Sequence, residues 1–157
     1  MWNLDAYIET SVWSHVFHVE TPDFQRATIE FLDLVKSGAF AAHISTIVLD
    51  EVSRADVERR DQIMHQIDLV EPVLLTVNDE AEALSQRYIE AGVLPPPDHI
   101  DALHVAVATV YEMDVLVSWN QRHLANIRRR DLFNSVNRIA GYRKALEITN
   151  PLEVGYE

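Results

Sequence analysis

The sequence contains no cysteine among its 157 residues. This absence excludes disulfide bonds, thiolate nucleophiles and metal sites built on thiolates, such as zinc or iron–sulfur centres. A reducing compartment fits the absence, so we expect the protein to be cytoplasmic. The sequence also lacks both a run of about 18 apolar residues that could cross a bilayer and a charged start followed by an apolar signal segment. No association with a membrane is therefore expected.

Basic residues are scarce: 13 Lys and Arg stand against 25 Asp and Glu, which gives a formal net charge of −12. This balance argues against nonspecific binding to a nucleic-acid backbone, because phosphate binding depends on Lys and Arg. The distribution is uneven, however, since seven of the 13 basic residues and only one acid lie between Ser118 and Ala145. That segment could form a local anion-binding surface, or it could be a solvated helix that pairs with acidic neighbours.

Short β-rich runs alternate with helical patterns along the chain, which predicts an α/β fold built of βαβ units around a parallel sheet. The length and the hydrophobic content of 48% suit a single domain over residues 1–157. We expect strands at 6–9, 42–45, 73–77, 115–118 and 145–148. Helices are expected over 22–36, from 45 or 46 through 51, from 78 or 79 through 89, and after the three prolines at 95–97.

The stretch DHIDALHVAVA, residues 98–108, places polar side chains at the start of a strongly apolar helix. Asp98 follows the prolines and suits the N-cap position, where acidic residues are favoured. Asp101 and His104 are three residues apart, so they share a face inside the apolar segment. A buried carboxylate needs a partner, which makes Asp101 a candidate functional residue.

In an open parallel sheet, ligands bind beyond the carboxyl ends of the strands. Glu9 ends the first strand, Glu51 lies about two turns into the helix after the second strand, and Asn120 follows the fourth. Each has a simpler interpretation: Glu9 as a helix-start acid, Glu51 as one charge in a charged segment, and Asn120 as the N-cap of a helix through residue 125. If they converge with Asp101, the three carboxylates and the amide form a hard-oxygen site suited to Mg²⁺ or Mn²⁺. Such sites are typical of phosphodiester hydrolysis.

Five stretches, in chain order, together resemble the PIN-domain nucleases, which include the VapC-type toxins of bacterial toxin–antitoxin pairs: YIETSVWS, STIVLDEV, DALHVAVA, LVSWNQRHLAN and ITNPLEV. The resemblance implies a three-layer α/β/α domain with a five-stranded parallel sheet and a Mg²⁺ or Mn²⁺ site that cleaves single-stranded RNA. It assigns the metal to Glu9, Glu51 and Asp101 and a catalytic position to Asn120.

The sequence departs from the family pattern at two of these positions. The first acid is Glu9, where Asp is commoner, and Asn120 stands where Asp is common. Asp5 is a rival first acid, but Glu9 is preferred because helix-start residues, Thr10 and Ser11, follow it directly. The neutral amide of Asn120 weakens the site for a second cation.

Five further residues are predicted to contact substrate: Ser11, His104, Ser118, Arg122 and His123. His104 could hydrogen-bond a carboxylate or a scissile phosphate, although packing at the sheet edge is the favoured role. His123 could orient Asn120 or contact substrate. Ser118 matches the usual Thr of the fourth motif.

Three functions fit these residues to different degrees. The leading one is a metal-dependent endoribonuclease for single-stranded RNA, the toxin of a type II toxin–antitoxin pair, with an antitoxin and a second copy of the chain as expected partners. The alternative is a PIN-like adaptor that binds RNA or protein without cleavage, and Asn120 keeps this alternative open. A response-regulator-like domain is disfavoured because no Lys stands near the end of the fifth strand.

Overall fold

The computed structural model describes residues 3–154 and contains one parallel sheet of five strands in the order β3-β2-β1-β4-β5. The chain order reverses between β1 and β4, where ligand sites of open parallel sheets form. The sheet confirms the predicted α/β class. The strands are β1 (Leu4–Ile8), β2 (Phe40–Ser45), β3 (Val73–Leu75), β4 (Val115–Val117) and β5 (Glu147–Thr149).

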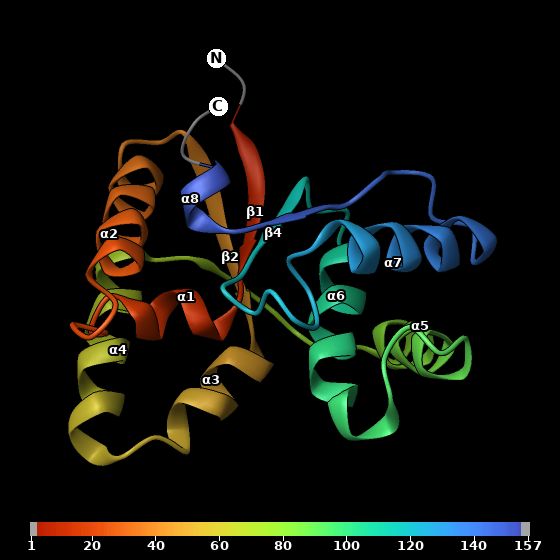
Figure 1. Ribbon diagram of the computed structural model, residues 1–157, viewed down its shortest axis with the longest axis horizontal. Coiled ribbons are helices and arrows are strands. Elements are labelled where there is room, and N and C mark those ends of the chain that lie inside the picture. The colour runs from red at the N-terminus through yellow and green to blue at the C-terminus, as the bar shows by residue number, and fades with distance from the viewer. Residues whose placement is uncertain (1–2, 155–157) are drawn as a thin grey trace.

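Helices cover both faces of the sheet and complete a three-layer α/β/α arrangement (Figure 1). One face is covered by α1 (Thr10–His15), α2 (Pro22–Lys36), α4 (Val57–Val70) and α8 (Pro151–Val154). The other is covered by α5 (Asp79–Glu90), α6 (His99–Val110) and α7 (Ile127–Ile139). Two further elements, α3 (Thr46–Ser53) and the 3₁₀ turn η1 (Pro96–Asp98), lead into α4 and α6.

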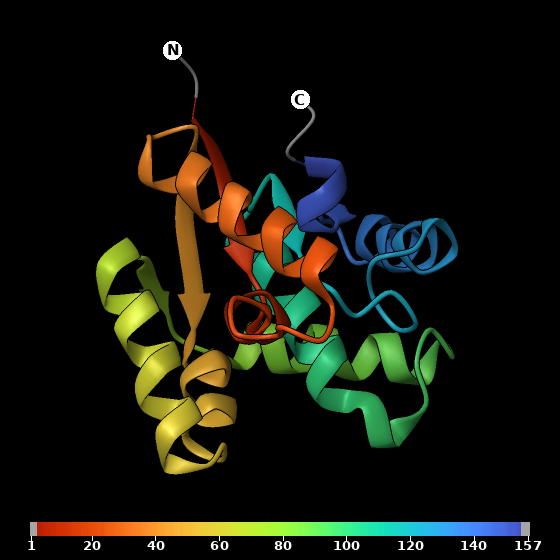
Figure 2. The same cartoon turned by 60° about the vertical axis from the view of Figure 1, so that its left-hand side comes forward.

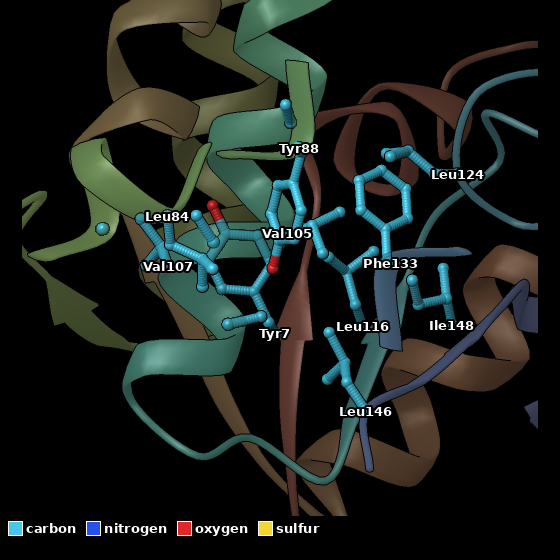
Figure 3. Close-up of a cluster of buried hydrophobic side chains, with 14 of the residues drawn as sticks. Tyr7, Leu84, Tyr88, Val105, Val107, Leu116, Leu124, Phe133, Leu146 and Ile148 are labelled. Carbon is cyan, nitrogen blue, oxygen red and sulfur yellow. The ribbon is translucent and has the colours of Figure 1, made fainter. Parts of the chain in front are cut away.

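Alternation along the central strands divides the core into two clusters, because successive side chains of a strand point to opposite faces. Tyr7 and Leu116 point toward α5, α6 and α7, where they pack with Tyr88 and Phe133 (Figure 3). Ala6, Ile8, Val115 and Val117 point the other way, toward α1, α2 and α4. Burial on both faces explains why residues 6–8 of β1 and all of β4 read as apolar runs.

The helix starts follow from local side-chain chemistry. Ser45 accepts a hydrogen bond from the backbone of Ile47 at the start of α3, and Asn78 does the same for Ala81 at the start of α5. Pro22 occupies the first position of α2, where its missing N–H costs nothing. The helix α6 buries seven of its twelve residues between α5 and the sheet, as its apolar sequence predicts.

Some predicted boundaries differ from the structure. The third strand ends at Leu75 rather than at 77, and the fifth begins at Glu147 rather than at 145. Residues 121–125 form a turn instead of a helix, so Asn120 does not cap a helix there. None of the helices between residues 3 and 154 is both long and apolar enough to span a lipid bilayer.

Candidate functional site

The candidate site lies at the carboxyl end of the sheet, around the ends of β1 and β4. The backbone N–H of Glu9 donates to Val117 over 3.0 Å, and that of Ser118 donates to Thr149 over 2.9 Å. The parallel ladder therefore extends one residue beyond the strands and brings Glu9 beside Ser118. In Figure 2 the arrowhead of β2 points toward α3, so α3 begins at this same end of the sheet.

The carboxylate of Glu9 is held by two serine hydroxyls. Ser11 and Ser118 each donate to its Oε1 over 2.6 Å, and the residue is only 6% exposed. Ser11 also accepts from the backbone of Trp119 over 2.9 Å, and Ser118 accepts from the backbone of Asn120 over 2.9 Å. Glu9 occupies the N-cap position of α1 but makes no capping hydrogen bond. Its carboxylate therefore contacts the two serine hydroxyls and not the backbone at the start of α1.

Glu51 is turned inward from α3 by donors on two other elements. Its Oε1 accepts from the hydroxyl of Thr10 over 2.6 Å and from Nε2 of His104 over 2.7 Å. The neighbouring Asp50 takes the solvent side and pairs with Arg54 at 2.8 Å. Glu51 is therefore distinct from the other charges of its segment.

Charge and burial act against each other at Glu51 and His104. Burial raises the pKa of Glu51, but the hydrogen bonds from His104 and Thr10 and the charges of His104 and Arg54 together outweigh burial and lower this pKa below its usual value. Burial lowers the pKa of His104, but its bond to Glu51 and the charges of Glu9, Glu51 and Asp101 raise the pKa above its ordinary value. Glu51 is consequently an ionised carboxylate at neutral pH.

Asp101 belongs to a second polar group at the start of α6. Its Oδ2 accepts from the side-chain amide of Asn120 over 3.2 Å and from Nδ1 of His123 over 2.9 Å. Nε2 of the same imidazole lies 3.5 Å from a carboxylate oxygen of Asp98. Asp98 occupies the N-cap position but its side chain caps nothing, so the predicted capping bond is wrong. It contributes instead to the cluster with His123.

Two sets of side chains bring potential ligand atoms within 4.8 Å of one another: Glu9 with Glu51 and His104, and Asp98 with Asp101 and His123. Asn120 connects them, because its backbone bonds to Ser118 and its amide bonds to Asp101. Within residues 3–154, no Lys or Arg forms an ion pair with any of the four carboxylates. Carboxylate-rich clusters whose only basic partner is a histidine suit a hard divalent cation, so these acidic groups can hold a metal ion.

The remaining predicted residues occupy different positions. Asp5, the rival first acid, lies in β1 toward its amino end, where its backbone contacts Asp114. His104 is fully buried and contacts Glu51 and Tyr7, so its contacts are with a carboxylate and a hydroxyl of the protein. Arg122 is exposed in the turn that carries Asn120 and His123.

Sequence reasoning missed the roles of Tyr7, Thr10 and Asp98. Tyr7 reads as an apolar strand residue, and Thr10 as a residue that only starts a helix. Their contacts with His104 and Glu51 span 97 and 41 residues of sequence, so no local spacing could reveal them. Asp98 carried a signal, because it lies three residues before Asp101.

Comparison with known proteins gives a structural match without a sequence match. No protein-family model matches the chain, and no curated protein matches it. A similar solved structure is that of VapBC2 from Rickettsia felis bound to a DNA fragment from their promoter, with a TM-score of 0.56 and 17% identity over 94% of this chain and 98% of the other. The chain has the PIN-domain fold. The likeness confirms the three-layer fold that the motifs predicted and, at this identity, concerns the fold alone.

Proposed function

We propose that this chain is a divalent-metal-dependent endoribonuclease that cleaves single-stranded RNA. One observation carries the proposal. Glu9 and Glu51 come from separate elements to the carboxyl end of the sheet, and hydroxyl or imidazole donors fix both of them. Among residues 3–154, no Lys or Arg forms an ion pair with either carboxylate. Two like charges held together in this way favour a cation between them.

The residues have distinct proposed roles. Glu9 and Glu51 hold Mg²⁺ or Mn²⁺, and Asp101, with Asp98 and His123, forms the adjoining acidic group. A bound cation would supply charge stabilisation at the phosphate and would lower the pKa of water. Ser11 and Ser118 orient Glu9, and Thr10 orients Glu51. Arg122 is exposed in the turn that carries Asn120 and His123, and its proposed role is to contact an RNA phosphate.

We propose further that the nuclease is the toxin of a type II toxin–antitoxin pair. The similar solved structure, VapBC2, is described as bound to promoter DNA, and its fold matches nearly the full length of this chain. An antitoxin is thus the proposed protein partner. Self-association into a homodimer remains a prediction from the family resemblance.

The test is cleavage of a pool of single-stranded RNA by the purified protein with Mn²⁺, with Mg²⁺ and with EDTA. We expect cleavage with either metal, none with EDTA and little cleavage of fully duplex RNA. Glu51→Gln removes a charge while keeping an oxygen acceptor for Thr10, and it should abolish cleavage. Glu30→Gln, on the exposed face of α2, is the matched control and should cleave normally.

The two side-chain contacts of Asn120 favour the adaptor alternative. Both side-chain atoms of Asn120 are already engaged, since Oδ1 accepts from the backbone of His123 over 3.0 Å and Nδ2 donates to Asp101 over 3.2 Å. An amide held in this way adds no charge for a second cation. RNA binding without cleavage, in the presence of a metal that measurably binds the protein, would favour the adaptor over the nuclease.

A further inference from the structure

A buried chain of hydrogen bonds runs beneath the site and returns to the helix on which it begins. At the start of α3, Ser45 accepts from the backbone of Ile47 over 3.2 Å. Its hydroxyl bonds to that of Tyr7 over 2.7 Å, and Tyr7 bonds to Nδ1 of His104 over 2.6 Å. Nε2 of His104 then reaches Glu51, on the next turn of α3, over 2.7 Å.

The burial of this chain fits it for holding a side chain rather than for contacting substrate. Ser45, Tyr7 and His104 are each fully buried, and within residues 3–154 no buried side-chain polar atom lacks a hydrogen-bond partner. Buried polar networks whose members are all satisfied rigidify the groups that they connect. The side chain of Glu51, by contrast, is 32% exposed and forms the boundary between this network and solvent.

We propose that His104 is a positioning residue, which fixes the Glu51 carboxylate toward Glu9 and is itself fixed by Tyr7. An ionised carboxylate only accepts hydrogen bonds, so Nε2 of His104 is the donor. Without this bond, Glu51 would keep only Thr10 as a donor and could leave the site for solvent, as its neighbour Asp50 does. The effect of His104 on metal binding rests on the proposed function, whereas its effect on the position of Glu51 does not depend on that function.

Two amide substitutions of His104 separate positioning from mere packing. The amide nitrogen of Gln lies the same number of bonds from Cα as Nε2 of His, and that of Asn the same number as Nδ1. His104→Gln therefore keeps a donor for Glu51 and loses the contact with Tyr7, while His104→Asn does the reverse. Both bury an amide at the same place. If His104 only packed in the core, the two substitutions would have the same effect on the position of Glu51.

The first measurement is the crystal structure of each variant without added metal. We expect the Glu51 carboxylate to stay bonded to residue 104 in His104→Gln and to leave its position in His104→Asn. An unchanged Glu51 in the Asn variant would overturn the proposal. This result is independent of nuclease activity, so it decides the positioning role even if the wild type neither binds Mn²⁺ nor cleaves RNA.

The second measurement is Mn²⁺ affinity by calorimetry, together with cleavage kinetics. His104→Asn should weaken Mn²⁺ binding by about 10- to 100-fold, the usual effect of losing a group that orients a metal ligand. It should lower kcat while leaving KM for RNA unchanged, because the buried ring cannot contact RNA. His104→Gln should retain most of the wild-type affinity. Equal losses in the two variants would contradict positioning.

A pair of tyrosine variants repeats the test without altering His104. Tyr7→Phe removes the hydroxyl that fixes the imidazole, so it should weaken Mn²⁺ binding. Tyr88 lies in the same buried cluster as Tyr7 (Figure 3), and Tyr88→Phe removes an equally buried hydroxyl. This hydroxyl bonds to Asn137 and to Thr109, near the carboxyl end of α6, and not to His104. The control should lose stability and keep Mn²⁺ affinity. Unchanged affinity in Tyr7→Phe would show that the hydroxyl does not fix the imidazole.

Discussion

The side-chain amide of Asn120 donates a hydrogen bond to the carboxylate of Asp101 over 3.2 Å. Asn120→Asp would replace this donor by a second carboxylate oxygen facing the first. Like charges at this distance repel, so the free energy of unfolding should fall without metal. Mn²⁺ should reverse the loss, and the melting temperature of the variant should rise more with Mn²⁺ than that of the wild type. Thermal melts with EDTA and with Mn²⁺ measure both effects, and RNA cleavage should increase in parallel.

Asn78→Asp provides the control for this charge change. Asn78 caps α5 through its oxygen, a role that Asp fulfils equally well, and it lies outside both acidic groups. The melting temperature of Asn78→Asp should rise with Mn²⁺ by as much as that of the wild type. An equal response to Mn²⁺ in the wild type and in Asn120→Asp would show that position 120 does not face the cation.

Glu9→Gln tests the charge at the centre of the site. The amide oxygen of Gln can still accept from Ser11 and Ser118, so the local structure should persist while one negative charge is lost. At a Mn²⁺ concentration a hundredfold above Kd, the wild type should gain about 2.7 kcal/mol of stability. The variant should gain much less, and Glu58→Gln, on the exposed surface of α4, should gain as much as the wild type. Identical melts of Glu9→Gln and wild type with Mn²⁺ would place the ion elsewhere.

The sequence predicted the sheet well because its strands carry a strong local signal. Residues 6–8 of β1 and all of β4 are buried on both faces, and caps such as Ser45 and Asn78 mark where the next helices begin. The edges were harder to predict. β3 and β5 are short, and the pairing of Leu75 with Ser45 and of Thr149 with Val117 decides where they end. Pairing of this kind depends on tertiary contacts that no local window contains.

The acids of the candidate site could be named from the sequence, but their arrangement could not. Glu9, Glu51 and Asp101 follow from strand-end placement and motif order. Asp101 lies in a group with Asp98 and His123 and not with Glu9 and Glu51. This grouping depends on the turn after β4, which places His123 against the start of α6. The bond between His104 and Glu51 joins residues 53 apart in sequence. Contacts over such distances are fixed by the packing of α3 and α6, not by either motif alone.

Asp114 connects β1 to the segment before β5. Its contacts predict that the stability of the fold depends on pH. Its carboxylate accepts from the backbone of Asp5 over 2.7 Å and pairs with Lys144 at 2.8 Å. Partial burial raises the pKa of Asp114, but the bonds from Lys144 and Asp5 outweigh it and hold the pKa below its usual value. The stabilisation is therefore complete above the unfolded pKa of about 3.9 and is lost as the pH falls through the lower folded pKa.

Asp114→Asn should lower the free energy of unfolding by about 1 kcal/mol at pH 7, a modest value because solvent screens this partly exposed pair. The difference from the wild type should shrink as the pH falls below about 4. Urea unfolding across this pH range gives the measurement. Asp68→Asn, on the exposed surface of α4, should show no comparable difference at either pH. If the difference in free energy of unfolding between the wild type and Asp114→Asn stayed constant below a pH of about 4, the effect would come from packing and not from the charge.

Arg122 tests whether RNA reaches the site from the turn after β4. Its side chain is exposed beside Asn120 and His123, so Arg122→Ala should raise KM for single-stranded RNA several-fold and leave Mn²⁺ affinity unchanged. Loss of one phosphate contact should also reduce the slope of log binding constant against log salt concentration by about one. Arg143→Ala removes the same charge before β5, toward the amino ends of the strands. If both variants weaken RNA binding equally, the effect comes from net charge and not from a contact at the site.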